Sequence, residues 1–220
     1  MSSKIFGPVP VCVGSFSGIG NVGKLTTDRI CASLGCQTQR SIVSPGFPPQ
    51  VTVAIDGQVR MHQVELRSCP GREDLLFFSG DTQPLTPESM YGLAGEILKA
   101  ARSWGSMDVI TLAAYVGPSE DEIFGATTDS RLAEELERSG ISLLKNGIVG
   151  GLNGILVGLA PLYGMRGVCL MGKTAGEEEF DPVAANHLTE AVGRLLDLDI
   201  PLEKQELDNG PVDESYAAYR

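Results

Sequence analysis

Apolar and polar residues alternate along the chain in two periods, which predict strands and helices in turn. Short apolar runs bounded by glycine or polar residues predict buried strands, and apolar positions three and four residues apart predict amphipathic helices. The expected strands span residues 8–16, 74–80, 107–116 and 166–172, and the expected helices span 21–34, 86–104, 130–140 and 181–198.

Capping signals support two of these helices. Thr86 precedes Pro87 and Glu88, which is the order expected of an N-cap, a first-turn proline and a first-turn acid. Asp181 followed by Pro182 starts the last helix in the same way. Residues 117–129, rich in glycine and acids, are expected to form a loop.

Residues 50–66 form two alternating runs around Asp56-Gly57, which is a strong signal for a β-hairpin because the turn favours positive φ. The hairpin adds antiparallel strands to an otherwise alternating strand-and-helix order. We therefore predict an α/β fold, with a mixed, mostly parallel sheet and helices on both faces.

The chain is expected to form one domain over residues 1–200, followed by a tail over residues 201–220. The tail contains five acids, a Gly-Pro pair and little apolar content before Tyr216. Such a composition cannot bury a core, so a flexible acidic tail is predicted.

The glycine-rich apolar segment 147–164 leaves two interpretations open. Its small residues suit close packing of helices at a subunit interface, and a buried core segment explains them equally well.

The net charge of −11 excludes several classes of function. A nucleic-acid binder needs a basic face, and an anionic membrane surface would repel this chain. No apolar run is long enough to span a membrane, and no signal peptide is visible at the N-terminus. Acidity of this kind most simply serves solubility.

The five cysteines are odd in number and form no C-x-x-C pair. Cys12 and Cys169 lie in apolar runs and are interpreted as small core residues. A disulfide framework or a zinc site is therefore not expected, and a cytoplasmic location is predicted.

The segment from Gly14 to Arg29, GSFSGIGNVGKLTTDR, contains parts of two nucleotide-binding motifs. The dinucleotide motif needs an acid about twenty residues further on, and residues 36–46 contain none. The P-loop needs Ser or Thr after its lysine to bind magnesium, and Leu25 follows Lys24. A strand-to-helix turn is the favoured interpretation, with an anion or subunit contact at the helix start as an alternative.

Other candidates for chemistry have simpler explanations. His62 lies in the hairpin and His187 in the last helix, without a nucleophile signature nearby. Asp81 and Glu88 flank a loop at the end of a strand, where Glu88 suits a helix start. Lys173 follows the last strand and could bind an anion, although a surface lysine is the simpler interpretation. No catalytic residue, cofactor site or metal site is expected.

Taken together, several segments resemble the proteasome assembly chaperone family, of the second-subunit type found in archaea and eukaryotes. The resemblance runs collinearly over about residues 8–198. It rests on GSFSGIGNVGK, SPGFPPQVTVAIDGQVR, DLLFFSGDTQPLTPESMYGLAGEIL, GATTDSRLAEEL, GIVGGLNGILVGLA and GVCLMGKTAG.

The resemblance implies a phosphorylase-like α/β domain that self-associates and handles proteasome core subunits without catalysis. The chain ends in Ala218, Tyr219 and Arg220, similar to the hydrophobic-Tyr-X ending of proteasome activators. These three residues are the expected partner-binding site for the core α-subunits. Assembly chaperone and gate-opening activator both remain open.

Two alternatives compete with this function. One is a phosphorylase-like enzyme that binds a phosphate or nucleoside at the loop from Gly18 to Lys24. The other is a structural subunit of a different assembly, in which the acidic tail only increases solubility.

Overall fold

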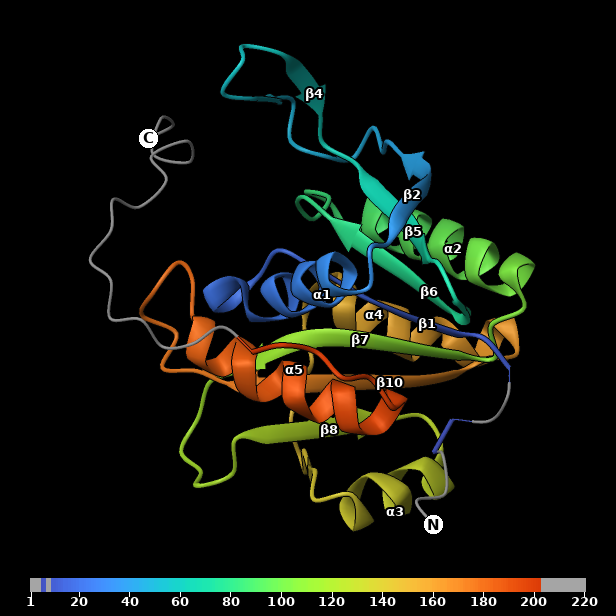
Figure 1. Ribbon diagram of the computed structural model, residues 1–220, viewed down its shortest axis with the longest axis vertical. Helices are drawn as coiled ribbons and strands as arrows, with labels where there is room; N and C mark the ends of the chain where they lie inside the picture. Colours follow the sequence, from blue (N-terminus) through green and yellow to red (C-terminus); the bar gives the residue numbers. More distant parts are fainter. Residues whose placement is uncertain (1–4, 7–8, 203–220) are drawn as a thin grey trace.

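Eight strands form the central sheet of the structure, a computed structural model that describes residues 5–6 and 9–202 (Figure 1). The strand order is β2-β5-β6-β1-β7-β10-β8-β9. The strands are β1 (Val11–Phe16), β2 (Gln37–Ile42), β5 (Val64–Cys69), β6 (Arg72–Gly80), β7 (Asp108–Tyr115), β8 (Ile123–Thr127), β9 (Ser142–Leu143) and β10 (Arg166–Lys173).

The middle of the sheet is parallel and its flanks are mixed. β6, β1, β7 and β10 run in the same direction, whereas β5 is antiparallel to β6 and β8 is antiparallel to β10. The parallel strands are almost continuously apolar because helices cover both of their faces. The predicted mixed, mostly parallel sheet is confirmed.

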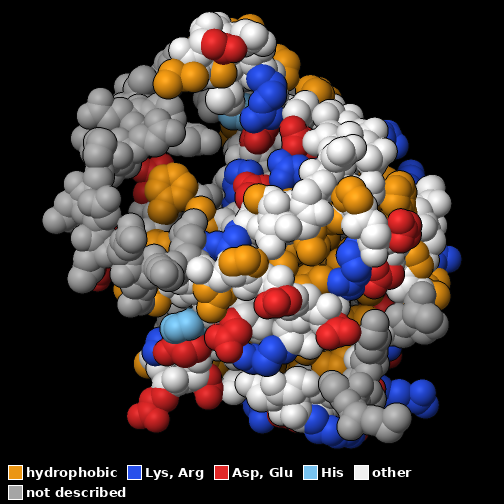
Figure 2. All heavy atoms as spheres, viewed as in Figure 1, with side chains coloured by type: hydrophobic (Ala, Val, Ile, Leu, Met, Phe, Trp, Pro, Cys, Tyr) orange, Lys and Arg blue, Asp and Glu red, His pale blue; other side chains and the backbone are white. Residues whose placement is uncertain are grey.

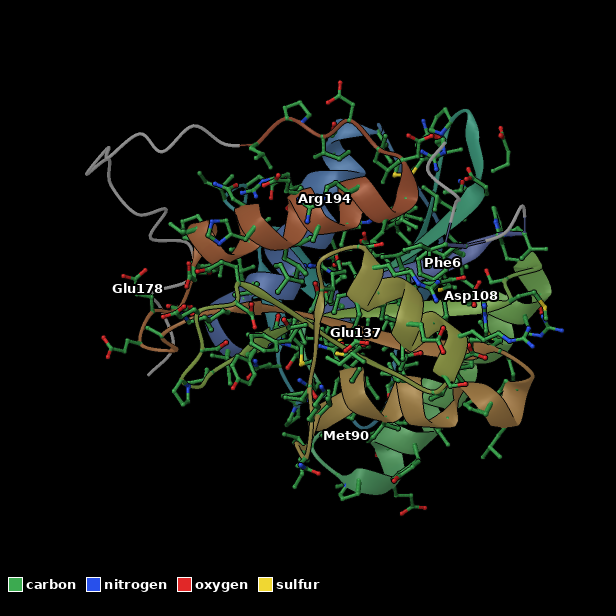
Figure 3. All side chains as sticks on the ribbon, turned by 90° about the horizontal axis from the view of Figure 1, so that it is seen from below. Phe6, Met90, Asp108, Glu137, Glu178 and Arg194 are labelled. Carbon is green, nitrogen blue, oxygen red and sulfur yellow. A yellow bond between two sulfur atoms is a disulfide. The ribbon has the colours of Figure 1, made fainter. Side chains whose placement is uncertain are left out.

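Helices lie on both faces of this sheet. Figure 3 shows the layers from the side, with the helix that carries Arg194 on one face and the region that carries Met90 on the other. The helices are α1 (Val22–Ser33), α2 (Pro87–Trp104), α3 (Ser130–Arg138), α4 (Gly151–Leu159) and α5 (Pro182–Leu196), with 3-10 turns η1 (Ile19–Asn21) and η2 (Ala160–Tyr163). One apolar cluster lies under α1, α3 and α5, and a second lies under α2 and α4.

The helix starts follow the capping signals of the sequence. Thr86 Oγ1 accepts a hydrogen bond from the Ser89 N–H at 3.3 Å, and Asp181 Oδ1 accepts one from the Ala184 N–H at 2.9 Å. Gly105 ends α2 with φ of 97°, which glycine adopts without steric cost. The two predicted N-caps are thus confirmed.

The predicted loop over residues 117–129 is wrong in its second half. Ile123–Thr127 forms β8, which pairs with β10 from Ile123–Gly172 to Thr127–Val168. This strand is only five residues long and follows a run of acids, so its own pattern is weak. Pairing with a long buried neighbour stabilises it, which is a tertiary effect.

The predicted hairpin exists, but its second run is divided into two strands. β3 (Val51–Val53) and β4 (Val59–Met61) pair in a separate two-stranded sheet, and β5 joins the central sheet instead. Figure 1 shows β4 at the end of an arm that projects from the layered body. The chain turns at His62 and Gln63, where the N–H of Gln63 binds the Asp81 carboxylate at 3.0 Å.

The cysteine prediction is wrong for one pair. Cys36 and Cys69 form a disulfide, with their Cα atoms 3.9 Å apart. Cys36 precedes β2 and Cys69 ends β5, and these strands are antiparallel neighbours with Gln37 opposite Ser68. Strand pairing therefore brings together cysteines that are 33 positions apart, so the cysteines no longer support a reducing compartment.

Segment 147–164 contributes to the core, as one of its two interpretations expected, and packing at a subunit interface stays a prediction. Leu152, Asn153, Leu156 and Val157 form the buried side of α4. Ile155 and Leu159 are partly buried against the same core, whereas Leu162 in η2 is 80% exposed.

Candidate functional site

The glycine-rich loop after β1 forms one wall of a cleft at the carboxyl end of the parallel strands. Gly20 has φ of +57°, which permits the tight turn. Gly23 lies against β7, since a Cβ there would be only 2.1 Å from the Leu112 carbonyl oxygen. The strand-to-helix turn predicted for this loop is therefore confirmed at Gly20 and Gly23.

The opposite wall is the start of α4 with the loop before it. Buried Asn153 joins the two walls: its Oδ1 accepts from the Phe16 N–H at 3.3 Å, and its Nδ2 donates to the Leu112 carbonyl at 3.1 Å. Gln83 makes a second bridge, donating to the Ser17 carbonyl at 3.1 Å and accepting from the Leu152 N–H at 2.9 Å. Two amides thus fix the width of the cleft.

The cleft between these walls has a volume of about 430 Å³. Its floor is apolar, with Phe16, Ala113 and Met171, and its rim includes Ile148. No acidic, basic or histidine side chain lines it among the residues that the structure describes. Such a site suits uncharged, apolar groups rather than an ion.

Two glycines of the cleft have no local structural reason to be glycine. Gly18 has φ of −163° and Gly150 has φ of −85°, which are conformations that any residue adopts. A Cβ at Gly18 would meet nothing nearer than 3.9 Å, and one at Gly150 would meet nothing within 4 Å. Both positions therefore leave the backbone open to close approach by a bound group.

The lysine of the glycine-rich loop does not point into the cleft. Lys24 Nζ donates to Asp28 Oδ2 at 2.8 Å and to Ser79 Oγ at 3.1 Å. The two following threonines are buried, and Thr26 Oγ1 donates to the Ala185 carbonyl at 3.2 Å. Thr27 Oγ1 donates to the Gly23 carbonyl at 3.0 Å, so both hydroxyls bond within the fold and neither takes the place of the magnesium ligand that a P-loop would have at Leu25.

Asp28 in α1 belongs to a charged network with side chains of β5. Arg67 donates to Asp28 Oδ1 at 3.0 Å and to Glu65 Oε2 at 2.7 Å. Burial alone would raise the pKa of Glu65, but the hydrogen bonds and charge of Arg67 outweigh it, so the pKa lies below its ordinary value. This network links α1 to β5, and its four charged side chains are engaged with one another.

The remaining candidate residues do not meet in one place. Lys173 Nζ donates to the Ser119 carbonyl, and His187 Nδ1 lies 3.2 Å from Glu122 Oε2 at an exposed position. Asp81 binds Arg60, and Glu88 lies in the first turn of α2. Within the described part of the chain, no three metal-ligating side chains cluster.

The free cysteines of the described residues are structural. Cys12, Cys31 and Cys169 are buried. Burial raises the pKa of Cys12 to about 12 and the pKa of Cys169 to about 11, so both stay protonated near neutral pH. The predicted role of Cys12 and Cys169 as small core residues is confirmed.

The predicted partner-binding residues, Ala218, Tyr219 and Arg220, lie outside the described residues, as does the rest of the acidic tail from residue 203. The cleft residues Gln83, Asn153 and Gly150 were not predicted. The sequence signal for this wall of the cleft is the cluster of glycines at 147, 150 and 151, which is interpreted from the sequence as a packing feature.

Known proteins are similar to this chain in sequence and in fold. The PAC2 family model matches residues 12–210. The uncharacterized protein MJ1210 of Methanocaldococcus jannaschii is 34% identical over 194 residues, covering 86% of this chain and 74% of that protein.

Two solved structures from Pyrococcus furiosus have the same architecture. PbaB, described as an archaeal proteasome activator, is 28% identical with a TM-score of 0.79, over 88% of this chain and 86% of that one. PbaA, an archaeal homolog of proteasome-assembly chaperone, is 24% identical with a TM-score of 0.73, over 89% and 84%. The likeness to PbaA concerns the fold alone.

None of the helices in the described residues has the length and apolar character required to cross a membrane.

The family model covers most of the chain, and the sequence segments that carry the resemblance all fall within the shared fold. The chain therefore belongs to the PAC2 family, the proteasome assembly chaperone family.

Proposed function

We propose that this protein is a non-enzymatic, homo-oligomeric assembly chaperone or activator of the proteasome core particle. The observation that carries the proposal is the likeness to PbaB, at 28% identity and a TM-score of 0.79 over most of both chains. PbaB is described as a proteasome activator, and membership of the PAC2 family points to the same partner.

The proposal includes the end of the sequence as the docking element. Ala218, Tyr219 and Arg220 would bind between α-subunits of the core, with the terminal carboxylate captured by a lysine or by backbone N–H groups. Tyr219 adds a flat ring with a hydroxyl group at low entropic cost. Several tails on one oligomer would bind far more tightly than one, through their effective concentration.

The division of the chain is part of the same proposal. A single phosphorylase-like domain over residues 1–200 would present a flexible acidic tail over residues 201–220, in the cytoplasm, where proteasome subunits are available. The acidic residues of the tail would keep it solvated, and a flexible chain spans roughly 5–6 Å times the square root of its number of residues.

The test is a pull-down that compares assembled core particles with isolated α-subunits. The wild type is compared with Tyr219→Ala, with a chain lacking the last three residues, and with Tyr216→Ala as a matched control in the same tail. We expect the first two variants to lose at least about tenfold in binding while the control retains it. Equal binding by all four chains would reject the docking model, and no wild-type binding to either form would reject the partner.

Core peptidase activity then separates the two roles. An activator raises the rate of peptide hydrolysis by the assembled core, and an assembly chaperone binds isolated α-subunits without raising it. The same four chains serve in this assay.

A phosphorylase-like enzyme that binds a phosphate or nucleoside beside Gly18 is the competing function. The cleft gives it little support, because Lys24 is bound to Asp28 and no cationic side chain in the described part of the chain lines the cleft walls. We expect no thermal shift with millimolar phosphate, nucleosides or nucleotides. A shift of several degrees with any of them would favour the enzyme.

A further inference from the structure

The hairpin of β3 and β4 presents an entirely apolar face to solvent. Val51 pairs with Met61 and Val53 pairs with Val59, so these four side chains share one face. They are 41%, 53%, 46% and 68% exposed, and Ile55 at the tip is fully exposed. Figure 2 shows hydrophobic side chains gathered on this arm, with an acidic side chain near its tip.

On the opposite face of the hairpin, one side chain reaches the body of the same chain. Arg60 lies on that face and binds the Asp81 carboxylate through both Nη atoms, at 2.6 and 3.2 Å. This ion pair directs the apolar face away from the body. A two-stranded hairpin is only marginally stable in water, so an uncovered apolar face of this kind calls for a partner.

The cleft described above is the complementary surface. No charged side chain among the described residues lines its walls, its floor is apolar, and Ile148 on its rim is 94% exposed. Gly18 and Gly150 leave its backbone open. A cleft of about 430 Å³ accommodates several aliphatic side chains but no second domain.

We propose that the hairpin of one copy docks its apolar face and tip in the cleft of a second copy. The inference rests on the homo-oligomer of the proposed function and names the interface that forms it. A second copy is the occupant because the described residues of each chain carry both surfaces and cover neither. A contact between two different surfaces is heterologous, and it closes into a ring when the rotation permits.

Charge at the edges of the two surfaces favours this pairing in one orientation. Asp56 lies exposed at the hairpin tip, and exposed Lys145 directly follows Leu144 on the cleft wall. The opposite rim is acidic: Gly176 lies against Ile19 and Val116, and residues 177–179 are all glutamates. Asp56 is therefore attracted to the Lys145 side and repelled from the other side.

The first experiment removes the apolar contact. Ile55→Ser combined with Val59→Ser changes two side chains that are exposed in their own chain, so the fold should persist, as circular dichroism would check. Sedimentation equilibrium and light scattering should show a dissociation constant of self-association raised at least about tenfold. Leu162→Ser is the control, because that side chain is equally exposed but lies on η2, outside the proposed interface.

The second experiment fills the cleft. Gly150→Leu adds a side chain at a position where a Cβ would meet nothing within 4 Å, so its own chain should accept it and the added side chain should block the hairpin of the next copy. Gly92→Leu, at an equally open glycine on α2, is the matched control. We expect only the first substitution to weaken self-association, again by at least about tenfold.

The third experiment tests the orientation. Asp56→Asn preserves the turn chemistry and Lys145→Gln preserves the length of the side chain. Each should weaken association a few-fold, and the combined variant should lose no more than either alone, because the two changes remove one interaction. Full additivity of the two losses would overturn the assigned charge pair.

A monomeric wild type overturns the inference, and so does an oligomer that neither the hairpin nor the Gly150 variant weakens. Weakening by Leu162→Ser or Gly92→Leu instead would assign the interface to the outer side of α2 and α4. Core binding is measured separately through Tyr219→Ala. If the interface is wrong, the hairpin and cleft variants still self-associate while the wild type binds the core. If the proposed function is wrong, the wild type self-associates but does not bind the core.

Discussion

Arg60 in β4 and Asp81 after β6 form a two-point ion pair, with Nη1–Oδ2 at 2.6 Å and Nη2–Oδ1 at 3.2 Å. Asp81 Oδ2 also accepts from the Gln63 N–H at 3.0 Å, where the chain leaves the hairpin for β5. One carboxylate thus orients the hairpin against the body of the molecule. Fixed parallel hydrogen bonds of this kind are stronger and more directional than a single contact.

Arg60→Ala should loosen the hairpin without unfolding the domain. Arg60 is 45% exposed, so we expect a local loss of about 0.5–1 kcal/mol. Hydrogen exchange should accelerate at hairpin amides such as Ala54 N–H, which donates to the Gln58 carbonyl, and should not change in β6. Arg138→Ala is the control, since it removes an exposed ion pair with Glu134. Unchanged exchange in the hairpin would show that the ion pair does not orient it.

The glycines of the first loop should respond differently to the same substitution. Gly23→Ala places a Cβ 2.1 Å from a backbone oxygen of β7, which forces α1 from the sheet and should cost about 1–3 kcal/mol or more. Gly18→Ala meets nothing nearer than 3.9 Å and should change stability by at most about 1 kcal/mol, with a gain expected from a less flexible unfolded chain. Urea denaturation measures both, and equal losses would contradict the packing assigned to Gly23.

Reduction of the Cys36–Cys69 disulfide should destabilise the domain. The bond joins residues 33 apart, and closing a loop of that length should stabilise the fold by about 3–4 kcal/mol through the unfolded chain. Denaturation midpoints should fall when the wild type is treated with dithiothreitol. Cys36→Ser should show the lower midpoint with or without reductant, and a wild type insensitive to reductant would contradict the bond.

Stability should decrease in mild acid through Glu65. Its pKa is lowered in the folded state, so its contribution is fully present above the ordinary value of 4.5 and is lost as the pH falls through the lowered value. Unfolding free energies measured between pH 7 and pH 3 should decline more for the wild type than for Glu65→Gln. At neutral pH that variant should lose about 1–3 kcal/mol, because Arg67 loses a charged acceptor. Parallel pH profiles for the two chains would contradict this contribution.

Most of the fold was predictable from local patterns. The apolar runs at β1, β7 and β10 are long because they are buried on both faces, and the N-caps Thr86 and Asp181 use only neighbouring residues. The family was also predictable, since many short segments match in order over the domain. The composition excluded a basic nucleic-acid surface without reference to any fold.

The candidate site was less accessible to sequence. Both walls of the cleft contain glycine clusters that the sequence shows, at 18–23 and 147–151. The two walls come together through the hydrogen bond between Asn153 and Phe16, which are 137 positions apart. Gln83 and Leu152 come together over a separation of 69 positions in the same way. No local pattern marks an amide that bridges two distant loops.

The sequence therefore specified whatever depends on neighbours: the periodicity of helices and strands, the turn at Asp56-Gly57 and the net charge. The fold specified whatever depends on pairing between distant segments: the short strand β8, the Cys36–Cys69 bond, the neutral cleft and the outward apolar face of the hairpin. The physical reason is that local preferences act over a few residues, whereas strand pairing and burial join groups whose separation along the chain carries no periodic signal.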